Sequence, residues 1–577
     1  MDRQAWIAIT LCVIGLVGWQ IYMMKHPAPA RVSASPSPSP SLAASSFSPI
    51  PQSVSPPPPN ATPPPAADAV SAFTEKKEVL RNSDRELRLT NRGGAISEVI
   101  LVNHVAEGSQ RVILNSSDRV PIGAILQRPD AVALPEFTIS HMPDGGVHFE
   151  RATPEHIDIQ KKFFIPPASQ KKDNFVAQMD VNFRNDGAQT FNYPNYFVAL
   201  GSARPIHLND MPNYTHLTWC VNGKAKSIDV SWFAPQNSFF GLQKRPARDF
   251  YDEKLPGAEW AGVSNQFFVT LLAPLNGKAS EVWAHRFEIK QDGGVTLPAI
   301  EGAMGMPGFQ VQPGQTASLH FEMYAGPKLY HRLAQLEHNE AEIMDFGVLK
   351  IVSQTLLNLM NLLHHYLGNY AAAILALTTI VKLTLWPLQN KANRSMRRMS
   401  ALSPKMQELR EKFKDDPTRM NQEVMKLYKE YGINPVSGCL PMVIQIPIFF
   451  GLFTMLRQTV ELRNSSFLWV HDLSQPDTIG HIPILGWPLN ILPLIMALTN
   501  VWMMRITPKT GDATQQRVMM FTPIIFVVFC YNFAAALSLY YTTQNLFTIL
   551  QLYQNRRQPM PTLEKVIPPG KKSRRGK

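Results

Sequence analysis

Long apolar runs and polar stretches alternate along this chain of 577 residues. The first apolar run covers residues 5–24, enough to cross a hydrocarbon core of about 30 Å at roughly 1.5 Å per residue. Bulky residues stand before Lys25, where a signal-peptide cleavage site would have small ones. We therefore expect an uncleaved anchor at residues 1–26, with a cleaved or lipidated signal as the alternative.

Five further apolar runs follow in the second half of the chain. Only a few residues around Asn532 separate the last two, and their summed length of about 36 residues favours two spans over one. Together with the anchor they predict six transmembrane helices, five of which form a core at residues 368–555. The five runs are residues 369–388, 436–456, 482–503, 518–531 and 534–553.

Residues 72–326 show a different pattern, in which apolar and polar residues alternate between clusters of Gly, Pro and Asn. Period-two alternation is typical of strands with one buried face, and about 250 residues can bury a sizeable core. We expect an all-β, sandwich-like domain that folds in water, preceded by a Pro- and Ser-rich linker at residues 27–71. The clearest alternation places on one face Phe175, Ala177, Met179, Val181 and Phe183.

Residues 327–367 place leucines at helical spacing, but later Lys, Gln, Asn and His side chains interrupt the apolar run. An amphipathic helix lying in the membrane interface fits this pattern better than a span does.

Charge predicts the orientation of the spans. The net charge is +12, and the basic residues concentrate in two places. Residues 389–435 carry eleven Lys or Arg against six acids, and the tail at residues 556–577 carries eight against one. Because basic loops stay in the cytoplasm, both termini are expected there and residues 27–367 largely in the periplasm.

The basic loop has a helical pattern of its own. Two amphipathic helices flank a break at Asp416 and Pro417, and Gly432 follows the second. We expect a cytoplasmic helical hairpin at residues 391–432.

The chain lacks the sequence patterns of common catalytic and metal sites. Three of its four cysteines lie in apolar runs, which leaves no disulfide framework or cysteine metal site. There is no phosphate-binding loop, no His-Glu-x-x-His and no nucleophile elbow. We expect no enzyme activity, no metal and no cofactor.

One charged residue lies inside an apolar run: Lys382 in "LTTIVKLTLWPL". Its position about 9 Å before the end of the span permits a snorkelling lysine. The alternative is a functional cation in a hydrated recess, because a charge in the bilayer usually faces protein or water. Polar residues of three spans are available to line such a recess, although ordinary hydrogen bonds between helices would also explain them. These residues are Thr378, Gln445, Tyr540, Tyr541 and Asn545.

Several separated motifs resemble those of the YidC/Oxa/Alb membrane protein insertases, in the form with a large periplasmic domain found in Gram-negative bacteria. In chain order they are "LTNRGGAISEVIL", "NPVSGCLPMVIQIPIFFGLFTML", "LWVHDLS" and "FTPIIFVVFCYNFAAALSLYYTTQNLFTILQ".

The resemblance implies an insertase and chaperone for inner-membrane proteins, with a hydrophilic groove open to cytoplasm and lipid. It places the groove cation at Lys382, where the family usually has arginine, the groove threonine at Thr378, and the aromatic substrate contact at Tyr541 beside Tyr540. Lysine keeps the charge but not the planar fork of arginine. The implied partners are nascent inner-membrane proteins, the Sec translocon, the lipid bilayer, and a ribosome bound through the basic tail and cytoplasmic loops.

Two other functions compete with this interpretation. Polar groups within the membrane also mark the solute paths of secondary transporters and channels, but the chain has no evident inverted repeat and few acids inside its spans. A non-catalytic assembly scaffold, with the β domain as its binding module, is the second alternative.

Overall fold

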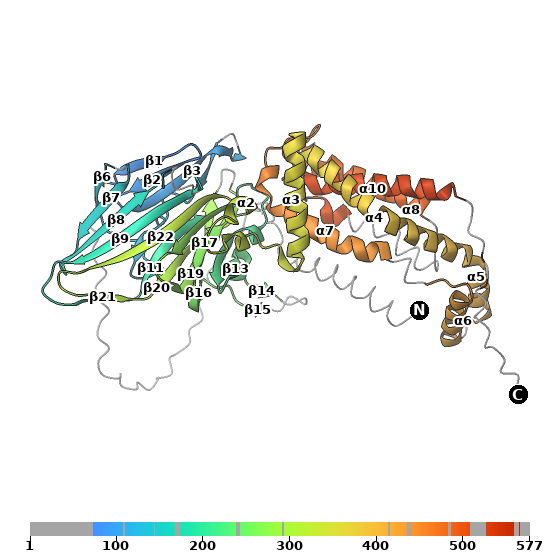
Figure 1. Ribbon diagram of the computed structural model, residues 1–577, viewed down its shortest axis with the longest axis horizontal. Coiled ribbons are helices and arrows are strands. Elements are labelled where there is room, and N and C mark those ends of the chain that lie inside the picture. Colours follow the sequence, from blue (N-terminus) through green and yellow to red (C-terminus); the bar gives the residue numbers. More distant parts are fainter. Residues whose placement is uncertain are drawn as a thin grey trace, which may run out of the picture.

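The computed structural model describes most of the chain after residue 72. It covers residues 73–107, 110–143, 145–167, 173–237, 243–290, 294–413, 416–434, 440–482, 486–507, 527–558, 563 and 565. The predicted anchor, the linker, most of the run at 518–531 and most of the basic tail therefore lie outside the described residues. The described part has a β-rich domain at one end of its long axis and helices at the other (Figure 1).

The β domain contains a large antiparallel sheet of nine strands, in the order β13-β12-β17-β18-β22-β9-β8-β7-β6. Its strands are β6 (Thr138–His141), β7 (Val147–Ala152), β8 (Ile157–Phe164), β9 (Val176–Asn185), β12 (His216–Val221), β13 (Lys224–Asp229), β17 (Trp260–Ser264), β18 (Phe268–Pro274) and β22 (Thr316–Pro327).

A five-stranded sheet, in the order β16-β19-β20-β11-β5, packs on this large sheet, and a four-stranded meander of β1 to β4 precedes both in the chain. The five strands are β5 (Ile125–Leu126), β11 (Tyr196–Ala203), β16 (Phe250–Ala258), β19 (Ala279–Lys290) and β20 (Thr296–Met306). The meander consists of β1 (Lys77–Arg81), β2 (Arg85–Thr90), β3 (Ala95–Val105) and β4 (Arg111–Leu114). Two short pairs complete the domain: β10 (Phe191–Tyr193) with β21 (Phe309–Val311), and β14 (Gln236–Asn237) with β15 (Gln243–Arg245).

The two larger sheets form a sandwich because each presents an apolar face to the other. Along β9 and the residue just before it, the five alternating residues of the predicted face, from Phe175 to Phe183, are all buried. Gly302 in β20 permits the closest approach, since a Cβ there would lie 3.0 Å from both Leu217 and Val263 of the facing sheet. The prediction of a sandwich-like β domain is therefore confirmed, and its last strand ends at Pro327.

The predicted amphipathic segment at residues 327–367 is only partly helical. It contains the short helix α2 (Tyr330–Leu333), the 3₁₀ turns η5 (Glu340–Ile343) and η6 (Gly347–Leu349), and then α3 (Lys350–Leu367). Asn339 and Gly347 both have φ of 59°, a left-handed conformation that no continuing helix adopts. The long helix is therefore restricted to α3, and the expectation for residues 327–349 was wrong.

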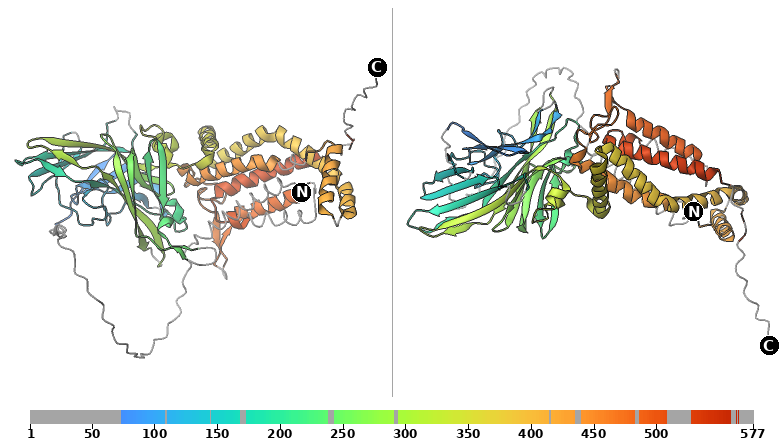
Figure 2. Two further views of the ribbon diagram at one scale, coloured as in Figure 1. Left: turned by 90° about the horizontal axis from the view of Figure 1, so that it is seen from below. Right: turned by 45° about the horizontal axis from the view of Figure 1, so that its top comes forward.

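Four long helices follow and lie side by side beyond α3 (Figure 2). They are α4 (Tyr370–Ala401), α7 (Leu440–Gln458), α8 (Ile491–Ile506) and α10 (Ala535–Arg556). Among the described residues only α4 is both long and apolar enough to cross a membrane, while residues 443–458 and 491–506 form shorter apolar helices. Gly368 at φ 67° ends α3, and the Asn369 side chain caps α4 by accepting from Ala372 N at 3.1 Å.

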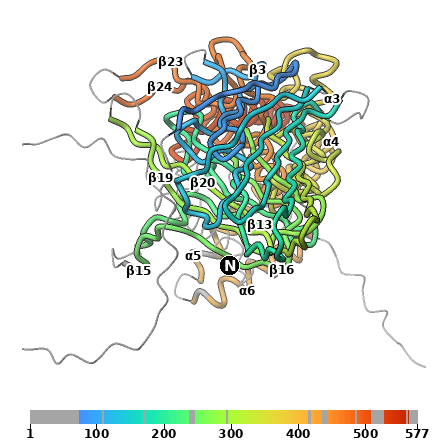
Figure 3. Tube along the Cα trace, turned by 90° about the vertical axis from the view of Figure 1, so that its left-hand side faces the viewer, coloured from blue at the N-terminus to red at the C-terminus, as the bar shows by residue number. Residues whose placement is uncertain are grey.

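The span predicted at residues 482–503 begins earlier in the sequence than the helix that the structure shows. Its first residues belong to a hairpin of β23 (Thr478–His481) and β24 (Pro488–Asn490), and α8 begins only at Ile491. Gly486 and Pro488 suit the turn and the edge strand of a hairpin better than the interior of a helix. In the view along the long axis this hairpin lies on the side opposite α3 and α4 (Figure 3).

The predicted helical hairpin also begins later than expected. Residues 391–401 continue α4, and the two shorter helices are α5 (Ser403–Lys412) and α6 (Pro417–Glu430). Asp416 caps α6 by accepting from Arg419 N at 2.9 Å, and Pro417 occupies its first turn. The seam between α5 and α6 buries Met406 and Tyr428.

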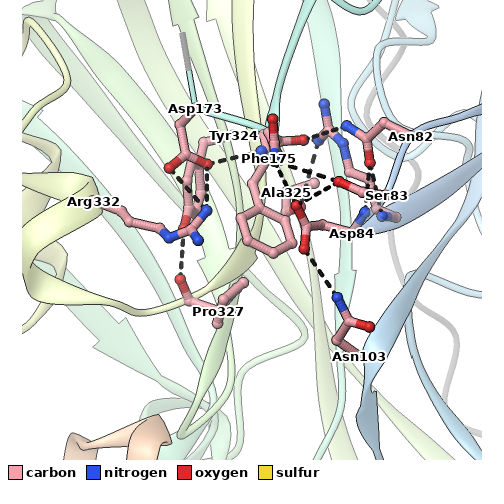
Figure 4. Close-up of polar contacts among 12 residues, drawn as sticks. Asn82, Ser83, Asp84, Asn103, Asp173, Phe175, Tyr324, Ala325, Pro327 and Arg332 are labelled. Carbon is pink, nitrogen blue, oxygen red and sulfur yellow. Dashed lines mark hydrogen bonds and ion pairs between the residues drawn. The ribbon is translucent and has the colours of Figure 1, made fainter. Parts of the chain in front are cut away.

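A polar junction holds the end of β22 and the start of the helical part against the β1–β2 turn (Figure 4). Arg332 of α2 donates to both carboxylate oxygens of Asp173, at 3.1 and 3.3 Å. Asp173 also accepts from Phe175 N at 2.8 Å. The buried Arg85 donates to the Phe175 carbonyl at 2.5 Å, and burial lowers its pKa to about 9. Three separate segments thus meet through Asp173 and Phe175.

We predict that Asp173→Ala lowers the free energy of unfolding of the β domain by about 1–2 kcal/mol, because it removes both contacts of that carboxylate. Asp173→Asn is expected to cost less, since its amide oxygen still accepts from Phe175 N. Thermal unfolding of the full chain in detergent, followed by tryptophan fluorescence, measures the effect. Asp186→Ala breaks an exposed ion pair with Arg184 and serves as a control with little effect. Equal losses in the two alanine variants would contradict this role of the junction.

Candidate functional site

Lys382 lies in the middle of α4 and is buried, with 5% of the residue exposed. Its ammonium group donates to Thr548 Oγ1 of α10 at 3.0 Å. Within the described part of the chain, no carboxylate lies within ion-pair distance of it. A buried ammonium group without an acid is unfavourable unless polar groups or water solvate it.

Polar side chains of α10 and α7 extend the contact of Lys382 across the helices. The Thr548 hydroxyl donates to the Gln544 carbonyl at 2.9 Å. The Gln544 side chain accepts from Gln445 Nε2 of α7 at 3.0 Å. Gln445 Nε2 also lies 3.3 Å from the hydroxyl of the buried Tyr540. Three helices are therefore linked through one network, here called the Lys382 network: Lys382, Gln445, Tyr540, Gln544 and Thr548.

A polar seam continues from this network toward α5 and α6. Gln551 Nε2 of α10 donates to Asn390 Oδ1 of α4 at 2.7 Å, and Asn555 Nδ2 lies 3.4 Å from the same oxygen. Arg397 donates to the Asn555 carbonyl at 2.7 Å. The contacts advance along both helices in the same direction, so α4 and α10 pack in parallel.

The opposite half of the helical part, next to the β domain, is packed with apolar side chains. Ile374 and Leu377 of α4 are buried there, together with Leu452 and Met455 of α7 and Leu539 of α10. The Lys382 network and the polar seam therefore lie farther from the β domain than this apolar packing does.

The other predicted site residues lie around the Lys382 network in different ways. Thr378 is buried one turn before Lys382, and its hydroxyl donates to the Ile374 carbonyl of its own helix at 2.7 Å. The Tyr541 ring contacts Phe449 of α7 edge-on, with centroids 6.0 Å apart. Asn545 points to α8, where it donates to Thr499 at 3.1 Å. The structure thus does not bring Asn545 into the network.

Thr548, which contacts Lys382, and the polar seam that follows it were not among the residues predicted from the sequence. Gln544, Thr548, Gln551 and Asn555 recur at intervals of four, three and four, which places them on one face of a helix. That spacing was a usable signal for a polar face on α10. Their partner Asn390 could not be identified in this way, because it lies just past the predicted end of its span.

The arrangement supplies hydrogen-bond donors, acceptors and one positive charge, but no nucleophile paired with a base. Among the described residues, no group of three His, Cys, Asp or Glu side chains is placed to hold a metal. The chemistry available is the attraction and solvation of polar or acidic groups within an otherwise apolar bundle.

Two family models match this chain. The model described as the YidC periplasmic domain matches residues 79–359, and the one described as the 60Kd inner membrane protein matches residues 362–561. The two matches together cover the β domain and the helical part.

Similar proteins carry one common name. A protein named membrane protein insertase YidC from Syntrophus aciditrophicus is 30% identical over 97% of this chain and 100% of its own. Another of that name from Oleidesulfovibrio alaskensis is 28% identical over 95% of this chain and 98% of its own. A crystal structure of an active YidC insertase with its first transmembrane domain resolved covers 85% of this chain and 94% of its own, at 18% identity and a TM-score of 0.35. By its sequence, the chain belongs to the YidC family of membrane protein insertases.

Proposed function

We propose that this protein inserts other proteins into the bacterial inner membrane and assists their folding there, using the Lys382 network as the contact site for the incoming chain. The observation that carries the proposal is the buried ammonium group of Lys382, which meets a hydroxyl at 3.0 Å but no acid among the described residues. An acidic or polar flank of a substrate would supply the missing partner. The charge therefore attracts the segment that is hardest to move across a bilayer.

The proposed site lowers the barrier to moving the polar flank of a substrate into the bilayer, and it does not supply the driving force for insertion. Moving an unpaired polar group into hydrocarbon costs several kcal/mol. A hydrated recess over part of the bilayer would lower that barrier, because polar side chains and water replace the lost solvation. The apolar segment of the substrate then supplies the driving force, at about 25 cal/mol for each Å² removed from water. No nucleotide or cofactor is needed for this scheme.

We further propose the membrane arrangement that fits this role. The polar seam of α4 and α10, with α5, α6 and the basic tail, faces the cytoplasm, and the β domain lies in the periplasm. Six spans, including the anchor and the run at 518–531, make this arrangement consistent with the excess of basic residues in the loop and tail. Nascent inner-membrane proteins are the proposed substrates, and the ribosome and the Sec translocon are proposed partners.

We predict that Lys382→Ala slows the insertion of a substrate with an acidic flank by about tenfold, because a charged hydrogen bond contributes about 1.5–3 kcal/mol. Lys382→Arg keeps the charge and is expected to retain most of the activity. Insertion into vesicles containing the purified variants measures the rates. Lys254→Ala, an exposed lysine of β16, is the matched control. Equal activity of the Ala and Arg variants and the unchanged protein would refute the role of the charge.

We also predict that photoreactive residues at Thr378, Lys382 and Tyr541 cross-link to a ribosome-bound inner-membrane nascent chain. The same probe at Leu498, an exposed position of α8, should give far less product because it lies outside the network. Cross-links of equal yield at all four positions would indicate non-specific contact with the membrane, and solute flux through vesicles without cross-links would favour a transporter.

A further inference from the structure

A cavity of about 200 Å³ lies where the β domain meets the end of α7. Five separate parts of the chain line it: β12 and β13 with the turn before them, the loop between β17 and β18, the residue after β22, the η5 turn with Asp345, and the last residues of α7. One water needs on the order of 10–15 Å³ of such space, so the cavity has room for a small polar group together with its waters.

Two cationic side chains line this cavity without an acidic partner. Lys328 follows β22 and is only 3% exposed, and no described side chain forms an ion pair or hydrogen bond with its ammonium group. Arg457, in the last turn of α7, has a buried Nε with no hydrogen-bond partner in the described part of the chain. Its guanidinium lies 5.3 Å from the centre of the Tyr214 ring. Two neighbouring cations in one buried site repel each other unless an anion joins them.

Of the two acids that border the cavity, only Glu342 has a cationic partner among the described residues. Glu342 forms an ion pair with Lys350, and Asp345 accepts from Gly347 N at 2.9 Å. The lining histidine, His216, is neutral, because burial and the nearby charges of Lys328 and Arg457 lower its pKa to about 3. Lys226, the other lysine of the lining, pairs with Glu253, so among the described residues the two cations without an acid, Lys328 and Arg457, outnumber Asp345, the one lining acid without a cation. Burial also lowers the pKa of Lys328 to about 7, which a bound anion would raise again.

We propose that this cavity binds a phosphate-type anion, with Lys328 and Arg457 as its two cationic ligands. The hydroxyl groups of Thr218 and Ser227 border the same space and offer hydrogen bonds to further anion oxygens. The bound group would bridge a residue of the β domain and a residue of α7. It would thus connect the β domain to the helical part through charge, independently of the Lys382 network.

In the membrane arrangement proposed above, this end of the apolar helix α7 lies at the depth of the phospholipid headgroups. Its phosphate can therefore come from an anionic lipid or from free phosphate in solution, and the two sources share the same chemistry. A fixed Arg with a neighbouring Lys suits either source, because both present phosphate oxygens.

The test uses the full chain in two arms. In the first, inorganic phosphate is titrated at constant ionic strength into delipidated protein in neutral detergent, and thermal stabilisation is recorded. In the second, the protein is placed in nanodiscs that contain phosphatidylglycerol and phosphatidylcholine. It is then released from the nanodiscs, and the lipid that stays bound to it is identified by native mass spectrometry. We expect Lys328→Met and Arg457→Gln to weaken the response by about tenfold or more, whereas Lys254→Met leaves it unchanged.

The arms distinguish the sources and the alternatives. Stabilisation by phosphate alone identifies a free anion as the ligand, and selective retention of phosphatidylglycerol identifies a headgroup. Lys328→Met removes a buried charge, so without phosphate it should unfold at or above the temperature of the unchanged protein. Absence of any Lys328-dependent binding in both arms would overturn the proposal. If Lys328→Met does not fold, Arg457→Gln decides the question by the same two readouts.

Discussion

A charged or polar group inside a bundle of apolar helices must be solvated by the protein, because hydrocarbon supplies no hydrogen bonds. This constraint determines how the helices of this chain are arranged. Lys382 meets Thr548, and polar contacts continue through Gln544 to Gln445. The same requirement keeps α4 and α10 parallel and in register down to Asn390 and Gln551.

The β domain meets the helical part through several polar contacts rather than through one flexible connection. Gln266 Nε2 donates to the Arg457 carbonyl at 2.8 Å, and Arg463 donates to the Val105 carbonyl at 2.9 Å. Gln475 Nε2 lies 3.0 Å from His207 Nδ1. The last turn of α7 and the loops that follow it therefore contact three different parts of the β domain. The cationic cavity at Lys328 lies at the same boundary between the β domain and the helical part. Its lysine, like Lys382, is a buried charge that requires polar partners.

Much of the fold follows from local patterns in the sequence, and the failures have physical causes. Alternation predicted the buried face of β9, because a strand with one buried face leaves a period of two. Helical patterning predicted α6 and the break before it at Asp416 and Pro417, whereas the capping role of Asp416 came from the structure. The start of α8 was misplaced, because hydropathy alone does not distinguish an apolar hairpin from the first turns of a span.

Contacts between distant segments could not be predicted. The resemblance to a family pointed to Lys382 and Thr378, but Thr548 is 166 residues from Lys382, and nothing in the chain pairs them. The cavity at Lys328 is even harder to predict from the sequence, because it forms only where strands of the β domain meet the end of α7. Asn545 is the opposite case, a residue that was predicted for the site but does not belong to it. Its polar side chain made it a candidate, yet its amide donates to Thr499 of α8.

The central claim is that the Lys382 network is hydrated from the cytoplasmic side of the membrane. Thr548→Cys, in a chain whose four native cysteines are replaced, places a thiol next to Lys382 while leaving the lysine in place. A charged, membrane-impermeant thiol reagent is then applied to either face of sealed vesicles. The account predicts labelling from the cytoplasmic face and none from the periplasmic face. A folded protein that resists labelling from the cytoplasmic face, or reacts only from the periplasm, would contradict it.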